Sequence, residues 1–320
     1  MKAIVHSVYG PPGLLEFRDV EQPVAQDDEV LVRVHAAAVN PYDWHQATGA
    51  PYIFRIGKGI REPKLTAIGL DFAGQVEAVG RSVTRFQPGD EVFGLHAGAF
   101  AEYVCVPGDK AIVKKPASLT YVQAAALPVS ALSALQGLRD KGRIQPGQRV
   151  LINGAAGGIG TFAIQIATSF GAHVTGVCGT RNLDLVRSLG ADEVLDYTRQ
   201  DFTGSGRRYD LILDMMGNRT IADRRRALTA DGIIVVVGGP AGGRWLGAMT
   251  SLLKAMVLSR RTRPMLTRPV RADLVTVGEL VGAGTVTPAI DRHYPLSAVP
   301  DAIGYLGRGH ARGKIIIDVP

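Results

Sequence analysis

The apolar and polar positions of the chain are most regular in one strand, turn and helix near its middle. Residues 150–152 form an apolar run of the length of a buried parallel strand. Apolar residues then recur at helical spacing over 159–167. Between them lie the glycines Gly154, Gly157, Gly158 and Gly160. A strand, a glycine-rich turn and a helix in this order are the context in which such glycines indicate dinucleotide binding.

Residues before this unit predict short strands separated by glycine and proline turns. We expect these strands at 1–8, 29–38, 74–79, 90–93 and 101–106. Short strands with such turns favour a barrel or a sandwich. After the glycine turn, a helical pattern alternates with strands, which we expect at 173–178, 193–197, 209–214 and 232–237. This alternation predicts a doubly wound parallel sheet with right-handed crossovers.

These patterns predict an α/β protein with two domains. The β-rich domain is expected at residues 1–121 and 272–320, and its second part holds a helix at 274–281 and a last strand at 314–319. The parallel sheet is expected at residues 122–271, inserted between the two parts. A length of 320 residues suffices for two such domains.

Composition and charge are those of an ordinary globular protein. Hydrophobic residues make up 46% and charged residues 20%, and the net charge is +7. Part of this positive charge lies at 224–226, where a solvated helix face is expected, and we expect no nucleic-acid partner. Two distant cysteines, Cys105 and Cys178, favour a reducing, cytoplasmic location over a disulfide framework. No apolar run is long enough to span a membrane.

The glycine turn departs in one place from the common G-x-G-x-x-G fingerprint, because alanine occupies its first position. Glycine at 157 would let the backbone approach a pyrophosphate, and glycine at 160 would let the helix lie close to the strand. The alternative is an ordinary tight turn between a strand and a helix. The candidate cofactor-binding residues of the turn are Ala155, Ala156, Gly157, Gly158, Ile159 and Gly160.

The residues that follow the next strand favour NADP (as NADPH) over NAD. An NAD-specific unit usually carries Asp or Glu about 20 residues past the glycines. Here the stretch 178–182 contains no acid and instead offers Thr180, Arg181 and Asn182. Arg181 could bind a 2′-phosphate through charge-assisted hydrogen bonds. The alternative is that Arg181 is an ordinary surface residue at the start of a helix.

The order of several short motifs resembles the medium-chain dehydrogenase/reductase superfamily, in its zinc-independent NADPH:quinone oxidoreductase-like branch. The motifs are Val39–Asp43, Gly69–Gly74, Phe86–Val92, Gly98–Tyr103 and the turn Ala155–Gly160. The resemblance implies a GroES-like β-barrel catalytic domain, a Rossmann domain and a cofactor cleft between them.

The resemblance also implies roles for individual residues. Asn40 and Asp43 match positions that line the nicotinamide pocket, and Tyr42 is either a general acid or a packing residue. These three are the candidate catalytic residues. Further cofactor contacts are implied for Ser133, Tyr197, Gly217, Gly238, Gly239, Gly313 and Lys314.

No metal site is expected. Asn40 and Leu70 stand where the zinc-binding relatives have a cysteine and a histidine, and two cysteines cannot form a structural zinc lobe. The expected reaction is therefore hydride transfer from NADPH to a quinone or an α,β-unsaturated carbonyl. The substrate is expected to be small and hydrophobic. The alternatives are an NAD(P)-binding protein with little turnover and an alcohol dehydrogenase of the same superfamily.

The apolar segment 245–258 is expected to cover the substrate cleft or to form a subunit contact, and a homodimer is expected. The neighbouring cations at 260–263 leave contact with an anionic membrane surface as an alternative.

Overall fold

The structure is a computed structural model and describes residues 1–56, 59–64, 66–237 and 261–320. Within these residues the chain divides into two compact units. Unit 1 contains residues 1–132, 269–284 and 290–320, and unit 2 contains residues 133–268 and 285–289. The predicted segment 245–258 lies outside the described residues.

The division after residue 132 lies later than the predicted boundary at 121. Helix α2 (Tyr121–Ala125) packs on strands β3 (Glu29–Val39) and β4 (Asp71–Val79) of unit 1. The amide of Val129 also donates a hydrogen bond to Asp71 Oδ1 at 3.1 Å. These contacts attach the start of the alanine-rich stretch to unit 1. At the other side, the division falls after Arg268, three residues before the predicted boundary.

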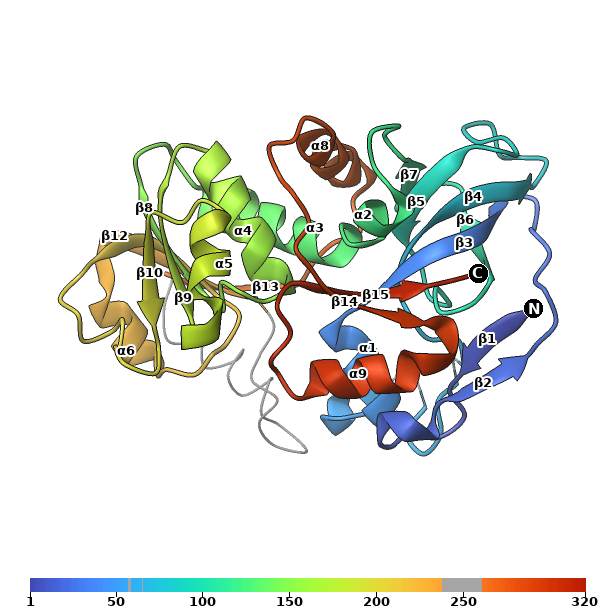
Figure 1. Cartoon of the computed structure of the whole chain (residues 1–320), viewed down its shortest axis with the longest axis horizontal. Coiled ribbons are helices and arrows are strands. Elements are labelled where there is room, and N and C mark those ends of the chain that lie inside the picture. The colour runs from blue at the N-terminus through green and yellow to red at the C-terminus, as the bar shows by residue number, and fades with distance from the viewer. Residues whose placement is uncertain (57–58, 65, 238–260) are drawn as a thin grey trace. The chain divides into compact units, whose positions relative to one another are not determined.

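Unit 1 is built on a largely antiparallel sheet in the order β14-β15-β3-β4-β5-β7, with β6 also paired to β3 (Figure 1). The further strands are β1 (Lys2–Val5), β2 (Glu16–Asp19), β5 (Glu91–Leu95), β6 (Tyr103–Pro107), β7 (Ile112–Lys114), β14 (Ile290–Pro295) and β15 (Lys314–Asp318). The helices are α1 (Pro41–Thr48), α2, α8 (Arg271–Gly282) and α9 (Val299–Gly307), with short 3₁₀ turns at 12–14, 52–55 and 296–298.

The core of unit 1 forms around β3. This strand pairs with β4, β6 and β15, so it has neighbours along its whole length. Its valines at 30, 32 and 34 are fully buried, as their β-branched side chains favour. Helix α9 packs on β3 and on α1 from the same unit.

Unit 2 contains a parallel sheet in the order β10-β9-β8-β11-β12-β13 (Figure 1). The strands are β8 (Arg149–Asn153), β9 (His173–Cys178), β10 (Glu193–Asp196), β11 (Tyr209–Asp214), β12 (Leu228–Val237) and β13 (Thr262–Met265). The helices are α3 (Pro128–Gln136), which begins in unit 1, α4 (Gly158–Ser169), α5 (Leu183–Ser188) and α6 (Ile221–Arg226), with a π-turn η3 at 137–142 and a 3₁₀ turn η4 at 180–182.

The predicted doubly wound parallel sheet is confirmed. Helix α4 packs on β8 and β9, α5 packs on β9 and β10, and η3 packs on β11, β12 and β13. The carboxyl ends of parallel strands meet at one edge of such a sheet, where ligands bind in open α/β folds. No helix of the described residues is long and apolar enough to cross a membrane.

Candidate functional site

The ends of three strands meet in unit 1 at a cluster of polar side chains. The antiparallel register pairs Ala38 of β3 with Asp71, the first residue of β4. It also pairs Val39 with Ile315, next to Lys314 at the start of β15. Asn40 follows β3 directly and precedes α1. The sheet therefore brings together side chains that are far apart in the sequence, such as Lys314 and Asn40, which are separated by 274 positions.

The ammonium of Lys314 is the centre of this buried cluster. It donates hydrogen bonds to Asn40 Oδ1 at 2.7 Å and to Asp71 Oδ2 at 3.2 Å. Its third close oxygen is the Val39 carbonyl at 3.5 Å. Lys314 is 2% exposed and Asp71 is fully buried. A buried lysine and carboxylate are tolerated only when they are paired and hydrogen-bonded in this way.

Asp43 is a second, differently bound carboxyl group in the same cluster. It lies in the first turn of α1, where its Oδ2 accepts a hydrogen bond from the backbone N–H of Asn40 at 2.7 Å. Its Oδ1 has no hydrogen-bond partner among the described residues. Burial raises the pKa of Asp43 to about 8; the Asp71 carboxylate also raises it, while the Asn40 amide and Lys314 oppose the rise.

The pairing scheme gives the cluster a simple charge balance. Burial raises the pKa of Asp71, and Lys314, Asn40 and the Val129 amide oppose that rise. Lys314 and Asp71 then form an ion pair, and Asp43 keeps its proton near neutral pH. The cluster as a whole is neutral, which is the state that a low-dielectric interior favours.

Two further residues of α1, Tyr42 and His45, are both half-buried. Tyr42 is next to the fully buried Asp43. His45 has a pKa lowered by burial, and its Nδ1 lies 2.7 Å from the Ala50 carbonyl oxygen. No three His, Cys, Asp or Glu side chains within the described ranges are grouped so that they could hold a metal ion.

The glycine turn of unit 2 has the geometry that a pyrophosphate site needs. A Cβ at Gly160 would lie 2.2 Å from the Gly154 carbonyl oxygen, so helix α4 can approach the strand only with glycine here. A Cβ at Gly157 would meet no atom closer than 3.5 Å, so the turn is open at this position. Helix α4 has no side-chain cap at its amino end. Uncapped N–H groups at such an end favour an anion.

A hydrogen-bond network stabilises the neighbouring strand end. Asp214, the last residue of β11, is fully buried, pairs with Arg224 and accepts hydrogen bonds from the N–H groups of Met216 and Gly217, both at 3.0 Å. Asn153, at the end of β8, donates to the same carboxylate at 2.8 Å. These bonds hold the turn around Gly217, whose φ is +59°.

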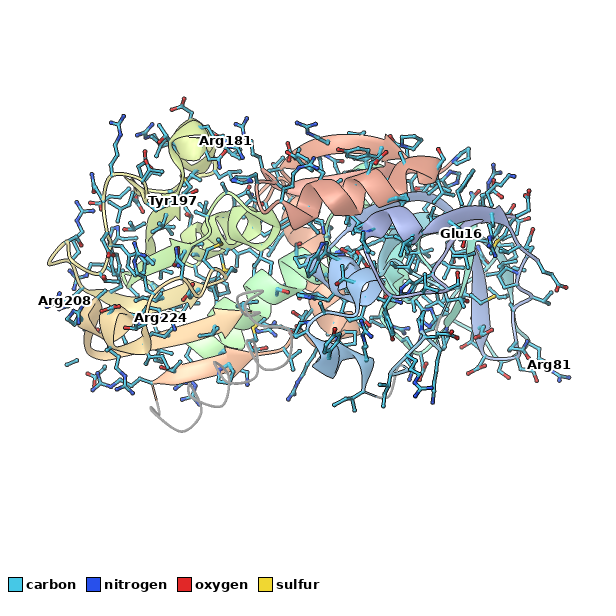
Figure 2. All side chains as sticks on the ribbon, turned by 90° about the horizontal axis from the view of Figure 1, so that it is seen from below. Glu16, Arg81, Arg181, Tyr197, Arg208 and Arg224 are labelled. Carbon is cyan, nitrogen blue, oxygen red and sulfur yellow. The ribbon has the colours of Figure 1, made fainter. Side chains whose placement is uncertain are left out.

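The end of β9 carries the residues predicted to select the nicotinamide cofactor. Thr180 and Arg181 are exposed, and a Cβ on Gly179 would lie 3.1 Å from the Tyr197 hydroxyl. This short distance places Tyr197, which is half exposed, beside the end of β9 (Figure 2). The strand register also places Asp196 beside Cys178.

Asp196 is an acidic residue near this strand end that lies outside the stretch 178–182 and was not predicted from the sequence. Its carboxylate accepts hydrogen bonds from Thr180 Oγ1 at 2.6 Å and from the Thr198 N–H and Oγ1 at 2.9 and 2.7 Å. The bond from Thr180 is the largest cause of its lowered pKa. Both oxygens of the Asp196 carboxylate therefore accept hydrogen bonds from neighbouring threonines. Asp196 lies at the end of β10, whereas Arg181 follows β9.

The remaining predicted contacts are dispersed between the two units. Ser133 of α3 is buried, and its hydroxyl lies 2.5 Å from the Thr267 hydroxyl. Gly313 has a φ of +97° and precedes the buried Lys314. Gly238 and Gly239 lie outside the described residues. Sequence reasoning also missed Asp71 as a site residue, although it directly follows Leu70 in one of the motifs.

The chain matches two family descriptions. Residues 26–117 match "Alcohol dehydrogenase GroES-like domain", and residues 189–317 match "Zinc-binding dehydrogenase". Together with the fold, these matches confirm the expected assignment. The chain belongs to the medium-chain dehydrogenase/reductase superfamily. Within it, the chain falls in the quinone oxidoreductase-like branch.

Individual relatives resemble the chain over nearly its whole length. The mitochondrial NAD(P)H oxidoreductase RTN4IP1 of Mus musculus is 35% identical, and the match covers 100% of this chain and 89% of the relative. The 2-methylene-furan-3-one reductase of Solanum lycopersicum is 33% identical, with 99% and 79% covered. The quinone oxidoreductase structure from Coxiella burnetii has a TM-score of 0.89 and 31% identity, with 100% and 99% covered.

Removing the charge of Lys314 is expected to destabilise unit 1 strongly. Lys314→Met keeps most of the volume but leaves Asp71 buried without its cation, which costs about 3–5 kcal/mol of unfolding free energy. Urea denaturation would measure the loss. The matched control is Lys114→Met, whose ion pair with Asp90 is exposed on the lysine side and is worth about 1 kcal/mol or less. Equal losses for the two variants would contradict the central role of Lys314.

Asp43→Asn is expected to change how stability depends on pH. The pKa of Asp43 is about 8 in the folded chain against 3.8 for the free group, so within this window only the folded chain keeps the proton. The free energy of unfolding therefore falls as pH rises through the window, by at most about 1.4 kcal/mol per pH unit. Asparagine cannot titrate, so the variant should gain stability relative to the wild type between about pH 5 and pH 8.

Urea denaturation at several pH values would measure this difference. Asp231→Asn, which removes an exposed carboxylate, serves as the control and should follow the wild type. Parallel pH profiles for Asp43→Asn and the wild type would show that Asp43 is ionised in the folded chain.

Proposed function

We propose that the chain is an NADPH-dependent reductase that transfers hydride to a quinone or to the C=C bond of an α,β-unsaturated carbonyl, without a metal. The observation that carries this proposal is the hydrogen bond from the Lys314 ammonium to Asn40 Oδ1. Asn40 stands at the position of a zinc-binding cysteine in metal-dependent relatives. Here its side-chain oxygen binds a fixed cation of the chain itself, and Leu70 offers no ligand atom.

The residues of unit 2 fit a nicotinamide dinucleotide. When bound, this cofactor supplies the hydride. The open turn at Gly157 and the uncapped end of α4 would hold the pyrophosphate, and Tyr197 would lie beside the adenosine. Arg181, with Asn182, would bind a 2′-phosphate, while the Thr180 hydroxyl donates its hydrogen to Asp196. Asp196 is an anion near this strand end, and its hydrogen bonds from Thr180 and Thr198 keep its pKa low. Arg181 is therefore the group that would balance the charge of a 2′-phosphate.

The available groups suit a conjugated acceptor. An unactivated ketone or alcohol normally requires a Lewis acid at its oxygen. A quinone or enone spreads the incoming charge over its conjugated system, and hydrogen-bond donors suffice to stabilise the resulting oxyanion. Tyr42, half-buried on α1, or a water molecule would donate the proton. The names of the tomato and Coxiella relatives agree with an acceptor of this type.

A substrate panel tests the proposed reaction. NADPH oxidation is measured with a quinone and with a long-chain enone, and NADP reduction is measured with a primary alcohol. We expect turnover with the quinone or the enone, preserved in the presence of a metal chelator. Turnover with the alcohol alone would overturn the proposal, and no turnover with any substrate would favour a cofactor-binding protein.

Arg181→Ala is expected to weaken NADPH binding and to leave NADH binding nearly unchanged. The lost charge-assisted hydrogen bond to the 2′-phosphate corresponds to about 1–3 kcal/mol. Titration calorimetry with both cofactors measures the difference. Arg187→Ala is the matched control, because Arg187 is an exposed cation of the neighbouring helix that pairs with Asp184. Equal affinity of the wild-type protein for NADPH and NADH would refute this role of Arg181.

A further inference from the structure

An acidic side chain reaches the end of β9 from the neighbouring strand. In an NAD-specific unit, an acid about 20 residues past the glycines accepts a hydrogen bond from the ribose 2′-hydroxyl. Thr180 occupies that position here, 20 residues after Gly160. The pairing of β9 with β10 places Asp196 beside Cys178, two residues before Thr180. The acid that the local sequence lacks is therefore supplied by β10.

Asp196 accepts three hydrogen bonds from two threonines. Its Oδ2 accepts the hydroxyl hydrogen of Thr180, with 2.6 Å between the two oxygens. Its Oδ1 accepts hydrogen bonds from the N–H and the hydroxyl of Thr198, at 2.9 and 2.7 Å. Because these bonds favour the ionised form, the pKa of Asp196 is lowered, and the carboxylate is an anion at neutral pH.

The nearby cation Arg199 offsets only part of this negative charge. Its Nε lies 3.9 Å from Asp196 Oδ2, and its side chain is 76% exposed. Solvent screens an ion pair of this kind, so its contribution is small. The carboxylate itself is buried at the strand end.

The direction of the Thr180 hydrogen determines what this hydroxyl offers to a ligand. A hydroxyl has one hydrogen and two lone pairs. Since the hydrogen of Thr180 is donated to Asp196, the oxygen of this exposed residue offers only lone pairs to a ligand. Such an acceptor suits the ribose 2′-hydroxyl of NADH, which can donate a hydrogen bond. It does not suit a 2′-phosphate, whose oxygens accept.

We propose that Asp196 is a specificity-determining residue that limits the preference of the chain for NADPH over NADH. Asp196 holds Thr180 as an acceptor and adds a negative charge at the strand end that would bind the 2′-phosphate. Arg181 acts in the opposite direction, so the cofactor preference is a balance between the two side chains. This inference rests on the proposed function, in which the nicotinamide dinucleotide binds at the glycine turn and the end of β9.

Replacing Asp196 by asparagine tests this balance. In Asp196→Asn the side-chain oxygen can still accept from Thr198, while the amide nitrogen donates to the Thr180 oxygen. The Thr180 hydrogen then becomes available to a 2′-phosphate, and the negative charge is removed. We expect the ratio of the Kd for NADH to the Kd for NADPH to rise about tenfold, the scale of one charge-assisted hydrogen bond. Titration calorimetry of the full chain with each cofactor measures this ratio without turnover.

Thr180→Val distinguishes an acceptor role of the hydroxyl from a donor role. We expect this variant to weaken NADH binding severalfold and to leave NADPH binding nearly unchanged, because the lost oxygen accepts from the ribose hydroxyl and gives no hydrogen to a phosphate. A larger loss for NADPH than for NADH would overturn the inference. Thr180→Ser keeps the hydroxyl and should keep the wild-type ratio.

Asp184→Asn is the matched control for unspecific charge effects, because Asp184 is an exposed acid in the first turn of α5. Its charge is screened by solvent, so the ratio should stay within about twofold of the wild-type value. An unchanged ratio in Asp196→Asn, or an equal rise in Asp184→Asn, would refute the role of Asp196 and leave the proposed function intact. A wild-type chain that binds neither cofactor would instead refute the proposed function, and this inference with it. Thr180→Val supplies the test if Asp196→Asn does not fold.

Discussion

The buried ion pair between Lys314 and Asp71 is the interaction on which unit 1 depends. Moving an ammonium out of water is unfavourable by several kcal/mol, and only a complete set of oxygen partners offsets this cost. Those partners come from β4 and from the end of β3, while Lys314 itself begins β15. The pair therefore fixes the register of three strands at one point, and with it the positions of Asn40 and α1.

The same pair determines what the site can do chemically. Unlike a bound metal ion, this cation is part of a side chain of the protein, and it acts through its ion pair with Asp71 and its hydrogen bond to Asn40. Its hydrogen bond to Asn40 Oδ1 orients the side-chain amide. The amide nitrogen, Nδ2, donates a hydrogen bond to the Ala38 carbonyl oxygen at 3.2 Å. Asn40 is thus held rigidly by bonds at both ends of its side chain. Preorganised polar groups of this kind stabilise a developing charge better than mobile ones do.

The sequence predicted features that depend on neighbouring residues and missed those that depend on strand register. The glycine turn is encoded within a dozen residues, and its geometry at Gly157 and Gly160 follows from the absent Cβ atoms. Asp196 escaped notice because it is near Cys178 only through the pairing of β9 with β10. Asp71 and Lys314 are 243 residues apart, and no local pattern joins them. The two compact units divide after residue 132 and the predicted domains divide after residue 121, because α2 packs on strands of unit 1 and alanine-rich periodicity does not reveal which unit a helix packs on.

Strand β8 connects the two edges of the parallel sheet rigidly. Strand β8 begins with Arg149 and ends with Asn153 before the glycine turn, and the residues between them are fully buried and paired with strands on both sides. Such a strand cannot shift at one end without moving its neighbours, because close-packed interiors resist small displacements. A change of side chain at the amino edge would therefore leave the geometry of the glycine turn unaltered. Coupling between the two edges would require the sheet to have a second arrangement, since energetic coupling is carried by elements with two discrete states.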